Sequence, residues 1–356
     1  IKANGVILTA TESPSSNDNL TINADIESKG GDVLLRAGDN INQNSGTIST
    51  IGHIVTLTAG YNDSDNLGGI TQGQTASITT GSTSAGTINL NSRDDIKISS
   101  LTAEDVNVTT TNGAIIDNNA DSNNITATNL ILSAAIGIGS GDALETAVSY
   151  LEAYNADSGN IEIENTGDLT IFGSGVVNDG GGDINITTSS SLYVEAEITA
   201  VDDGEINLTA NGSNADIVVR DTISSEDGDI NLDAERDILS EGDITAIESS
   251  GLGNINLNAG RDIILGTSAG YGDIYSEDGD INLTAGGNIT VDYYVGSDGS
   301  GNINFDAGND ISLITRVVGE ESWIYTGSGD INLVADNDIL IDALSEGITS
   351  DSGDII

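Results

Sequence analysis

Residues 279–291 read GDINLTAGGNITV, and this short stretch decides the fold because the chain repeats it. Residues 253–265 read GNINLNAGRDIIL, and residues 301–313 read GNINFDAGNDISL. Each copy opens with a glycine and an Asp or Asn, after which apolar side chains alternate with Asn. Alternation with period two is typical of a β-strand that buries one face.

The glycine that opens each copy, here called the anchor glycine, recurs along the chain. Looser copies begin at Gly31 and Gly86, and degenerate copies begin near Gly5, Gly52 and Glu104. From residue 159 onward the anchors follow one another at separations of 22 to 28 residues, at Gly159, Gly182, Gly204, Gly228, Gly253, Gly279, Gly301, Gly329 and Gly353. Self-similarity at such a period indicates a repeat architecture.

Each repeat contains three short β patterns. Ile230 and Leu232 share one face of the first strand, and a turn follows at residues 235–237. The pair at residues 263–265 is typical of the second strand, and residues 273–275 are typical of the third. Three strands in roughly 24 residues form one turn of a parallel β-helix, whereas a propeller blade needs about 40 residues.

The sequence therefore predicts an all-β chain folded as a parallel β-helix, that is, a β-solenoid with about three short strands per turn. One turn cannot bury its own Ile and Leu side chains, but stacked turns cover one another. A strand spacing of about 4.8 Å predicts a rod about 70 Å long. We expect one continuous solenoid over residues 1–356, with degenerate turns at 1–128, a distinct module at 129–172 and regular turns at 173–356.

Composition excludes several classes of protein. The chain has 45 Gly, 1 Pro, 2 Phe and 1 Trp, which suits many thin layers better than one large core. With 57 acidic and 9 basic residues, it lacks the clustered cations that nucleic acids require. The absence of Cys excludes a disulfide scaffold. Because the chain has no Met and ends in the opening of another repeat, we expect it to be a segment of a longer array.

The segment at residues 129–172 carries a family resemblance. It reads NLILSAAIGIGSGDALETAVSYLEAYNADSGNIEIENTGDLTIF and is similar to a module of large bacterial extracellular proteins related to filamentous haemagglutinin. The matching features include Ile136-Gly137, Leu144-Glu145-Thr146 and Gly159-Asn160-Ile161. The resemblance implies a right-handed parallel β-helix, secretion, and an adhesive or matrix-forming role.

Acidic residues at the anchors are candidate calcium ligands. If the turns stack in register, the residues that follow the anchor glycines form a ladder of like charges that needs cations, screening or neutral breaks. Asn254 and Asn302 are such breaks. Ca²⁺ prefers carboxylate oxygens, and the candidate ligands are Asp229, Asp280, Asp330, Glu226, Asp227, Glu277 and Asp278. The alternative is that these side chains bind turn backbone amides.

The outward Asn residues form a series of their own, which predicts a structural ladder of stacked amides. Its members are Asn89, Asn185, Asn207, Asn231, Asn256, Asn282, Asn304 and Asn332.

Aromatic residues concentrate late in the chain and are candidate ligand-binding residues. Tyr275 and Tyr325 each precede an anchor glycine by four residues, so we expect them to share a face two turns apart, with Trp323 close by. An exposed aromatic face can stack on sugar rings or dock a neighbouring fibre, and the alternative is partial burial over a turn. The long spacing that contains Arg316, Glu320 and Glu321 predicts a protruding loop, and Tyr271, Tyr293 and Tyr294 lie nearby in the sequence.

Taken together, these features predict a non-catalytic, extracellular chain. The single histidine, His53, lies at an anchor turn, and the abundance of carboxylates makes no one pair indicative of a hydrolase. We expect a stiff segment of a bacterial surface or matrix fibre that associates with like chains, without a certain cofactor apart from candidate calcium and without membrane insertion. The alternatives are a carbohydrate- or surface-binding module and a polysaccharide-degrading enzyme.

Overall fold

The computed structural model describes residues 1–13, 17–62, 67–83, 85–241, 246–266, 272–314, 322–342 and 347–356, with only the backbone described at residue 246. Two compact units divide the chain, Ile1–Gly167 and Asp168–Ile356. Within the described residues the structure is all β, and no helix is long and apolar enough to span a membrane.

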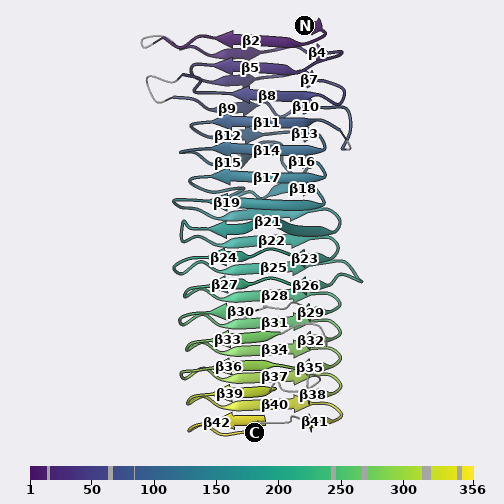
Figure 1. Ribbon diagram of the computed structural model, residues 1–356, viewed down its shortest axis with the longest axis vertical. Coiled ribbons are helices and arrows are strands. Elements are labelled where there is room, and N and C mark those ends of the chain that lie inside the picture. Colours follow the sequence, from purple (N-terminus) through teal and green to yellow (C-terminus); the bar gives the residue numbers. More distant parts are fainter. Residues whose placement is uncertain are drawn as a thin grey trace. The chain divides into compact units, whose positions relative to one another are not determined.

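Each unit is a parallel β-solenoid with three strands per turn of roughly 24 residues, which confirms the predicted fold class (Figure 1). The division between the units falls inside the segment at 129–172.

In the first unit the strands form three parallel stacks. The first stack contains β1 (Lys2–Ala3), β4 (Ile26–Ser28), β7 (Thr47–Ser49), β10 (Ser77–Thr79), β13 (Leu101–Thr102), β16 (Ile125–Thr126), β18 (Leu144–Ala147) and β20 (Ile161–Asn165). The second contains β2 (Val6–Ala10), β5 (Val33–Ala37), β8 (Ile54–Thr58), β11 (Thr87–Ser92), β14 (Asp105–Thr110), β17 (Asn129–Ala134) and β19 (Tyr150–Asn155). The third contains β3 (Leu20–Ile22), β6 (Ile41–Gln43), β9 (Ile70–Gln72), β12 (Ile96–Ile98) and β15 (Ile115–Asp117).

The second unit repeats this plan with a clearer register. The strands that follow the anchor glycines are β22 (Ile184–Thr188), β25 (Ile206–Ala210), β28 (Ile230–Ala234), β31 (Ile255–Ala259), β34 (Ile281–Ala285), β37 (Ile303–Ala307) and β40 (Ile331–Ala335). The next stack contains the start of β21 (Leu169–Asn178), β23 (Leu192–Val194), β26 (Ile217–Val219), β29 (Ile238–Ser240), β32 (Ile263–Leu265), β35 (Ile289–Val291), β38 (Ile311–Ile314) and β41 (Ile339–Asp342). The third contains the end of β21, β24 (Ile198–Ala200), β27 (Ile223–Ser225), β30 (Ala246–Ser249), β33 (Asp273–Ser276), β36 (Tyr294–Ser297), β39 (Trp323–Thr326) and β42 (Gly347–Ser350).

The core of each unit follows from period-two alternation. In β34, Ile281 and Leu283 are fully buried while Asn282 between them faces outward. The same pattern recurs one turn away, where Ile281 pairs with Ile303 and Leu283 pairs with Phe305. Because each layer of Ile and Leu is covered by the next, stacking buries side chains that a single turn would leave in water.

The outward Asn residues form the predicted amide ladder. Along β22, β25, β28, β31, β34 and β37, each Asn Nδ2 donates to the Oδ1 of the preceding turn at 2.8–2.9 Å. Asn89 accepts the same bond from Asn107 at 3.0 Å in the first unit. The ladder therefore continues the backbone pairing on the outer face, and the structural interpretation of these residues is confirmed where these bonds occur.

The anchor prediction is confirmed for most of the first unit. Strands of the second stack follow Gly5, Gly31, Gly52, Gly86 and Glu104, so even the degenerate copies mark equivalent turns. Gly159 differs, because β20, which follows it, pairs with β18 in the first stack. Within this unit, the anchor pattern therefore precedes strands of two different stacks.

Candidate functional site

Aromatic side chains gather on the outer face of the third stack of the second unit. Tyr294 on β36 pairs in register with Trp323 on β39, and Tyr275 on β33 pairs with Gly296, which pairs with Tyr325. The residues between them, Ile274, Val295 and Ile324, are buried, so the aromatic side chains face outward and are half-buried. We call Tyr275, Tyr294, Trp323 and Tyr325 the aromatic strip.

A glycine makes room for the centre of the strip. A Cβ atom added at Gly296 would overlap with the phenol oxygen of Tyr294, so the Tyr294 ring lies over the glycine. The Tyr294 and Trp323 ring centroids are 5.7 Å apart with the rings tilted by 58°, and Trp323 and Tyr325 are 5.0 Å apart with a tilt of 46°. Tilted rings at these separations attract one another beyond their simple area burial. The strip is therefore ordered by its own contacts.

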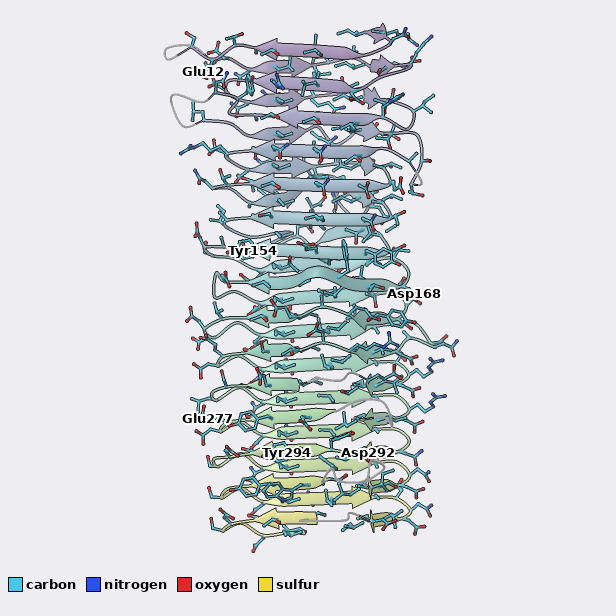
Figure 2. The ribbon with its side chains drawn as sticks, in the orientation of Figure 1. Glu12, Tyr154, Asp168, Glu277, Asp292 and Tyr294 are labelled. Carbon is cyan, nitrogen blue, oxygen red and sulfur yellow. The ribbon has the colours of Figure 1, made fainter. Side chains whose placement is uncertain are left out.

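Carboxylates border the strip. The Tyr275 hydroxyl donates to Asp298 Oδ2 at 3.3 Å, and the Tyr325 hydroxyl donates to Asp351 Oδ2 at 3.2 Å. Glu277 and Asp278 are exposed in the turn after β33, and Figure 2 labels Glu277 and Tyr294 among the outer side chains. Burial, followed by repulsion from Asp298, raises the pKa of the Tyr294 phenol. Burial also raises the pKa of the Tyr275 and Tyr325 phenols, so each tyrosine of the strip keeps its proton at neutral pH.

The structure brings together all three predicted ligand-binding residues. Tyr275 and Tyr325 share a face two turns apart, as their spacing predicts. Trp323 lies beside them, and its Nε1 donates to Thr349 Oγ1 at 3.4 Å. Tyr293 is buried and lies outside the strip. Tyr271 and the loop predicted around Arg316, Glu320 and Glu321 fall outside the described residues.

The predicted calcium ligands at the anchors lie in one ladder of hydrogen bonds. The Oδ1 atoms of Asp229, Asp280 and Asp330 accept bonds from the backbone N–H of the next turn at 2.7, 2.7 and 2.8 Å. The neutral positions Asn254 and Asn302 do the same, each at 2.9 Å. These contacts support the amide-binding interpretation. Every turn uses a side-chain oxygen to accept the bond, and a neutral Asn does this as well as a charged Asp.

The acids that precede the anchors make similar contacts. Asp227 Oδ1 and Asp278 Oδ1 accept bonds from the next turn, each at 3.2 Å. Glu226 Oε2 accepts a bond from the amide of Asp202 at 3.2 Å. Among the described residues, no three or more His, Cys, Asp or Glu side chains are grouped so that they could hold a metal ion. Calcium binding thus stays a prediction.

Substitution of Asp280 distinguishes a role in binding the backbone amide from a role in binding calcium. Asp280→Asn keeps the acceptor for the Asn302 amide, so we expect no loss of stability. Asp280→Ala leaves that half-buried amide unpaired, so we expect a loss of about 1 kcal/mol in the free energy of unfolding. The measurement is urea unfolding of both variants in calcium and in chelator. Calcium that stabilises the parent protein but not Asp280→Asn would show instead that the carboxylate binds the cation.

Two arginines contact a second ladder of acidic residues, and the sequence analysis missed these contacts. Asp237 is 3% exposed, and its Oδ1 accepts a bond from Arg261 Nε at 2.7 Å. Arg236 Nε lies 2.5 Å from Asp216 Oδ1 and 3.5 Å from Asp237 Oδ2. The available signal is the repeated Arg-Asp pair at the same turn, in Arg236-Asp237 and Arg261-Asp262. These arginines neutralise two buried carboxylates, since Asp216 is 7% exposed and Asp237 is 3% exposed.

Two other features bear on the enzyme alternative. In the first unit, burial, together with repulsion from the Asp117 carboxylate, raises the pKa of the Glu145 carboxyl to about 7. A carboxyl pair of this kind is the chemistry of glycoside hydrolases. However, Asp117 is only 8% exposed, and its Oδ1 accepts bonds from the Asn119 backbone and the Asn124 amide. Asp117 Oδ1 is therefore already engaged by neighbouring amide groups.

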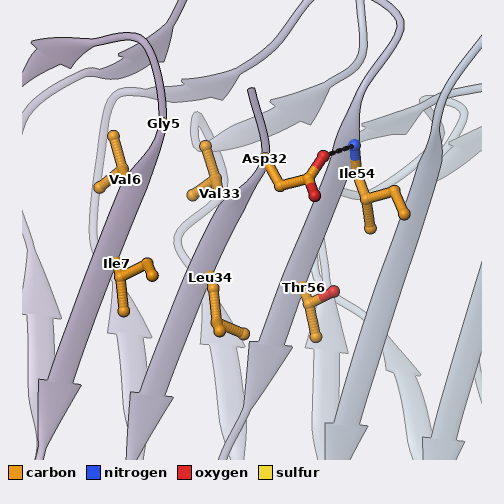
Figure 3. Close-up of a pocket in the computed structure, with 8 residues that line it drawn as sticks. All are labelled: Gly5, Val6, Ile7, Asp32, Val33, Leu34, Ile54 and Thr56. Atoms are coloured by element: carbon orange, nitrogen blue, oxygen red, sulfur yellow. Dashed lines mark hydrogen bonds between the residues drawn. The ribbon is translucent and has the colours of Figure 1, made fainter. Parts of the chain in front are cut away.

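A hollow on the outer face of β2, β5 and β8 is lined mainly by aliphatic side chains (Figure 3). Asp32 is the one ionisable group among its eight lining residues, and its Oδ1 accepts a bond from the Ile54 amide at 3.0 Å. His53 Nδ1 lies 3.9 Å from the same oxygen. The lining of this hollow thus lacks the paired acids that glycoside hydrolysis uses.

Comparison with known proteins gives no relative for this chain. No protein-family model, curated protein or solved structure matches it. The interpretation of function therefore depends on the geometry of the two units and of the aromatic strip.

Proposed function

We propose that the chain is a structural and adhesive segment of a secreted bacterial surface or matrix fibre, and that it associates with like chains. One observation carries the proposal. From β22 to β37 each turn repeats the same inward Ile pair and the same outward Asn-to-Asn bond. Such repetition supplies stiffness and length, in which one turn is interchangeable with the next.

The proposal includes a non-catalytic role and an extracellular location. The large excess of acidic residues favours solubility and contact with cations. The resemblance of residues 129–172 to filamentous haemagglutinin-type modules supports the same class of function. The aromatic strip favours glycan or surface binding as a second function, because rings on an outer face suit sugars.

Deletion of one complete turn tests interchangeability. Removing residues 204–227 joins Asp203 to Gly228 and places β22 against β28, where Ile184 and Asn185 meet Ile230 and Asn231. We expect this variant to fold and to assemble like the parent protein, as judged by circular dichroism and electron microscopy with calcium and with chelator.

The control removes half a turn, residues 204–215, so that inward and outward residues no longer meet their equivalents. We expect this control to lose its folded signal, because the Ile layers lose their cover. A whole-turn deletion that folds but no longer assembles would contradict the proposal, since assembly would then need a unique site.

A further inference from the structure

The aromatic strip is a binding site whose ligand can be specified further. We propose that Tyr275, Tyr294, Trp323 and Tyr325, with Asp298 and Asp351, bind a glycan that carries free amino groups. The inference rests on the proposed adhesive role, because it names the partner to which the segment adheres. The occupant follows from three properties of the strip: the arrangement of the rings, the position of the carboxylates and the net charge.

The arrangement of the rings suits a linear sugar chain. Tyr275 and Tyr325 lie two turns apart, which corresponds to about 10 Å at the usual strand spacing. The Tyr294 ring, which lies over Gly296, occupies the strand between them. Trp323 lies beside Tyr325 on β39, and the adjacent centroids are 5.0–5.7 Å apart. A pyranose presents C–H groups on one face and hydroxyls around its edge, so successive sugars can stack along such a strip. The rings are held in register by backbone pairing before any ligand arrives.

The carboxylates select the charge of the sugar. Asp298 and Asp351 are fixed beside the rings by the Tyr275 and Tyr325 hydroxyls, and Glu277 and Asp278 add exposed negative charge. A protonated amine can form a charge-assisted hydrogen bond with such an acid and can also lie over a ring face. A uronate or sulfated sugar would meet repulsion from these acids and from the net charge of −48.

The size of the strip disfavours a folded protein as the occupant. A stable protein interface buries about 800 Å² on each partner. Four half-buried rings on three adjacent strands offer much less area, whereas they match two or three sugar units. The area and charge of the strip therefore favour a glycan chain with amino groups as its ligand.

Trp323 gives a direct measurement, because it is the only tryptophan in the chain. We would titrate the complete 356-residue protein with glucosamine hexamer, with its fully N-acetylated form and with an oligouronate, in physiological salt. The expected result is a saturable change in tryptophan emission with the amine form, a change at least tenfold weaker in affinity with the acetylated form, and no change with the oligouronate.

Variants then assign the binding to the strip. Tyr325→Ala removes a ring, and we expect it to weaken binding at least tenfold by fluorescence. Asp298→Asn with Asp351→Asn keeps the rings but should abolish the preference for the amine form. Trp323→Ala is followed by calorimetry and should lose binding. Tyr193→Ala, at a half-buried tyrosine on β23, is the matched control and should bind like the parent protein.

Several outcomes would overturn the inference. Binding of the hexamer without a change in tryptophan emission would place the ligand elsewhere on the acidic surface. Equal binding by the parent protein and by the double Asn variant would indicate non-specific attraction. If the strip fails these tests while the whole-turn deletion still assembles, the glycan ligand is wrong and the structural role stands.

Discussion

Replacement of Phe305 by Ala is expected to lower the free energy of unfolding of the second unit by about 3–5 kcal/mol. Phe305 on β37 is 1% exposed and is among the largest fully buried side chains. It pairs in register with Leu283, which is fully buried one turn away. The ring therefore fills a layer of the core over Leu283, and its removal leaves a cavity beside that side chain.

Phe305→Leu provides the matched control. Leu208, Leu232, Leu257 and Leu283 occupy the same position in successive turns, so a leucine fits the backbone there. We expect this substitution to lower the free energy of unfolding by less than about 1.5 kcal/mol. Urea unfolding followed by circular dichroism measures both changes. An equal loss in the two variants would indicate that the turn requires the shape of the aromatic ring and not merely its volume.

Much of the second unit could be predicted because one physical rule acts on every turn. A strand buries alternate side chains, and a solenoid stacks equivalent strands, so Ile281 must lie over Ile255 and Asn282 over Asn256. The same rule predicts that Tyr275 and Tyr325 share a face. Sequence spacing is sufficient for such contacts because register alone determines them.

Other contacts depend on side-chain conformation and on close backbone approach, which spacing does not determine. The Tyr294 ring lies over Gly296 on its own strand, two residues away. At the corner before an anchor glycine, the buried Ser276 hydroxyl donates to the Gly253 carbonyl at 3.3 Å. Equivalent bonds are made by Ser225, Thr326 and Ser350. A hydroxyl three residues before an anchor glycine is the sequence signal for this contact.

The stack to which a strand belongs is also hard to predict where turns differ in length. Within the first unit, the anchor at Gly159 resembles the five earlier anchors, yet β20 lies in the first stack and not in the second. Apolar residues alternate on all three faces of a turn, so alternation alone identifies strands without identifying the face. The lengths of the intervening turns help to distinguish the faces, and these lengths vary most in the first unit.

Replacement of Gly279 by Ala is the second change for which we expect a large effect, a loss of about 3 kcal/mol in the free energy of unfolding of the second unit. A Cβ atom at Gly279 would lie well under 3.0 Å from the carbonyl oxygen of Gly253 in the preceding turn. That oxygen belongs to the backbone and also accepts the Ser276 bond, so neither atom can move without disturbing the corner. The same close approach occurs between Gly301 and Gly279 and between Gly329 and Gly301.

Gly30→Ala is the control for this substitution, because a Cβ atom there would meet nothing within 4 Å. We expect this change to be neutral or to stabilise by a few tenths of a kcal/mol, since alanine restricts the unfolded chain. Urea unfolding of both variants measures the difference. Gly279→Ala as stable as the parent protein would mean that adjacent turns can separate at the corner. Glycine would then be needed at the anchors for the conformation of the turn that each begins, and not for the close approach of stacked backbones that we infer here.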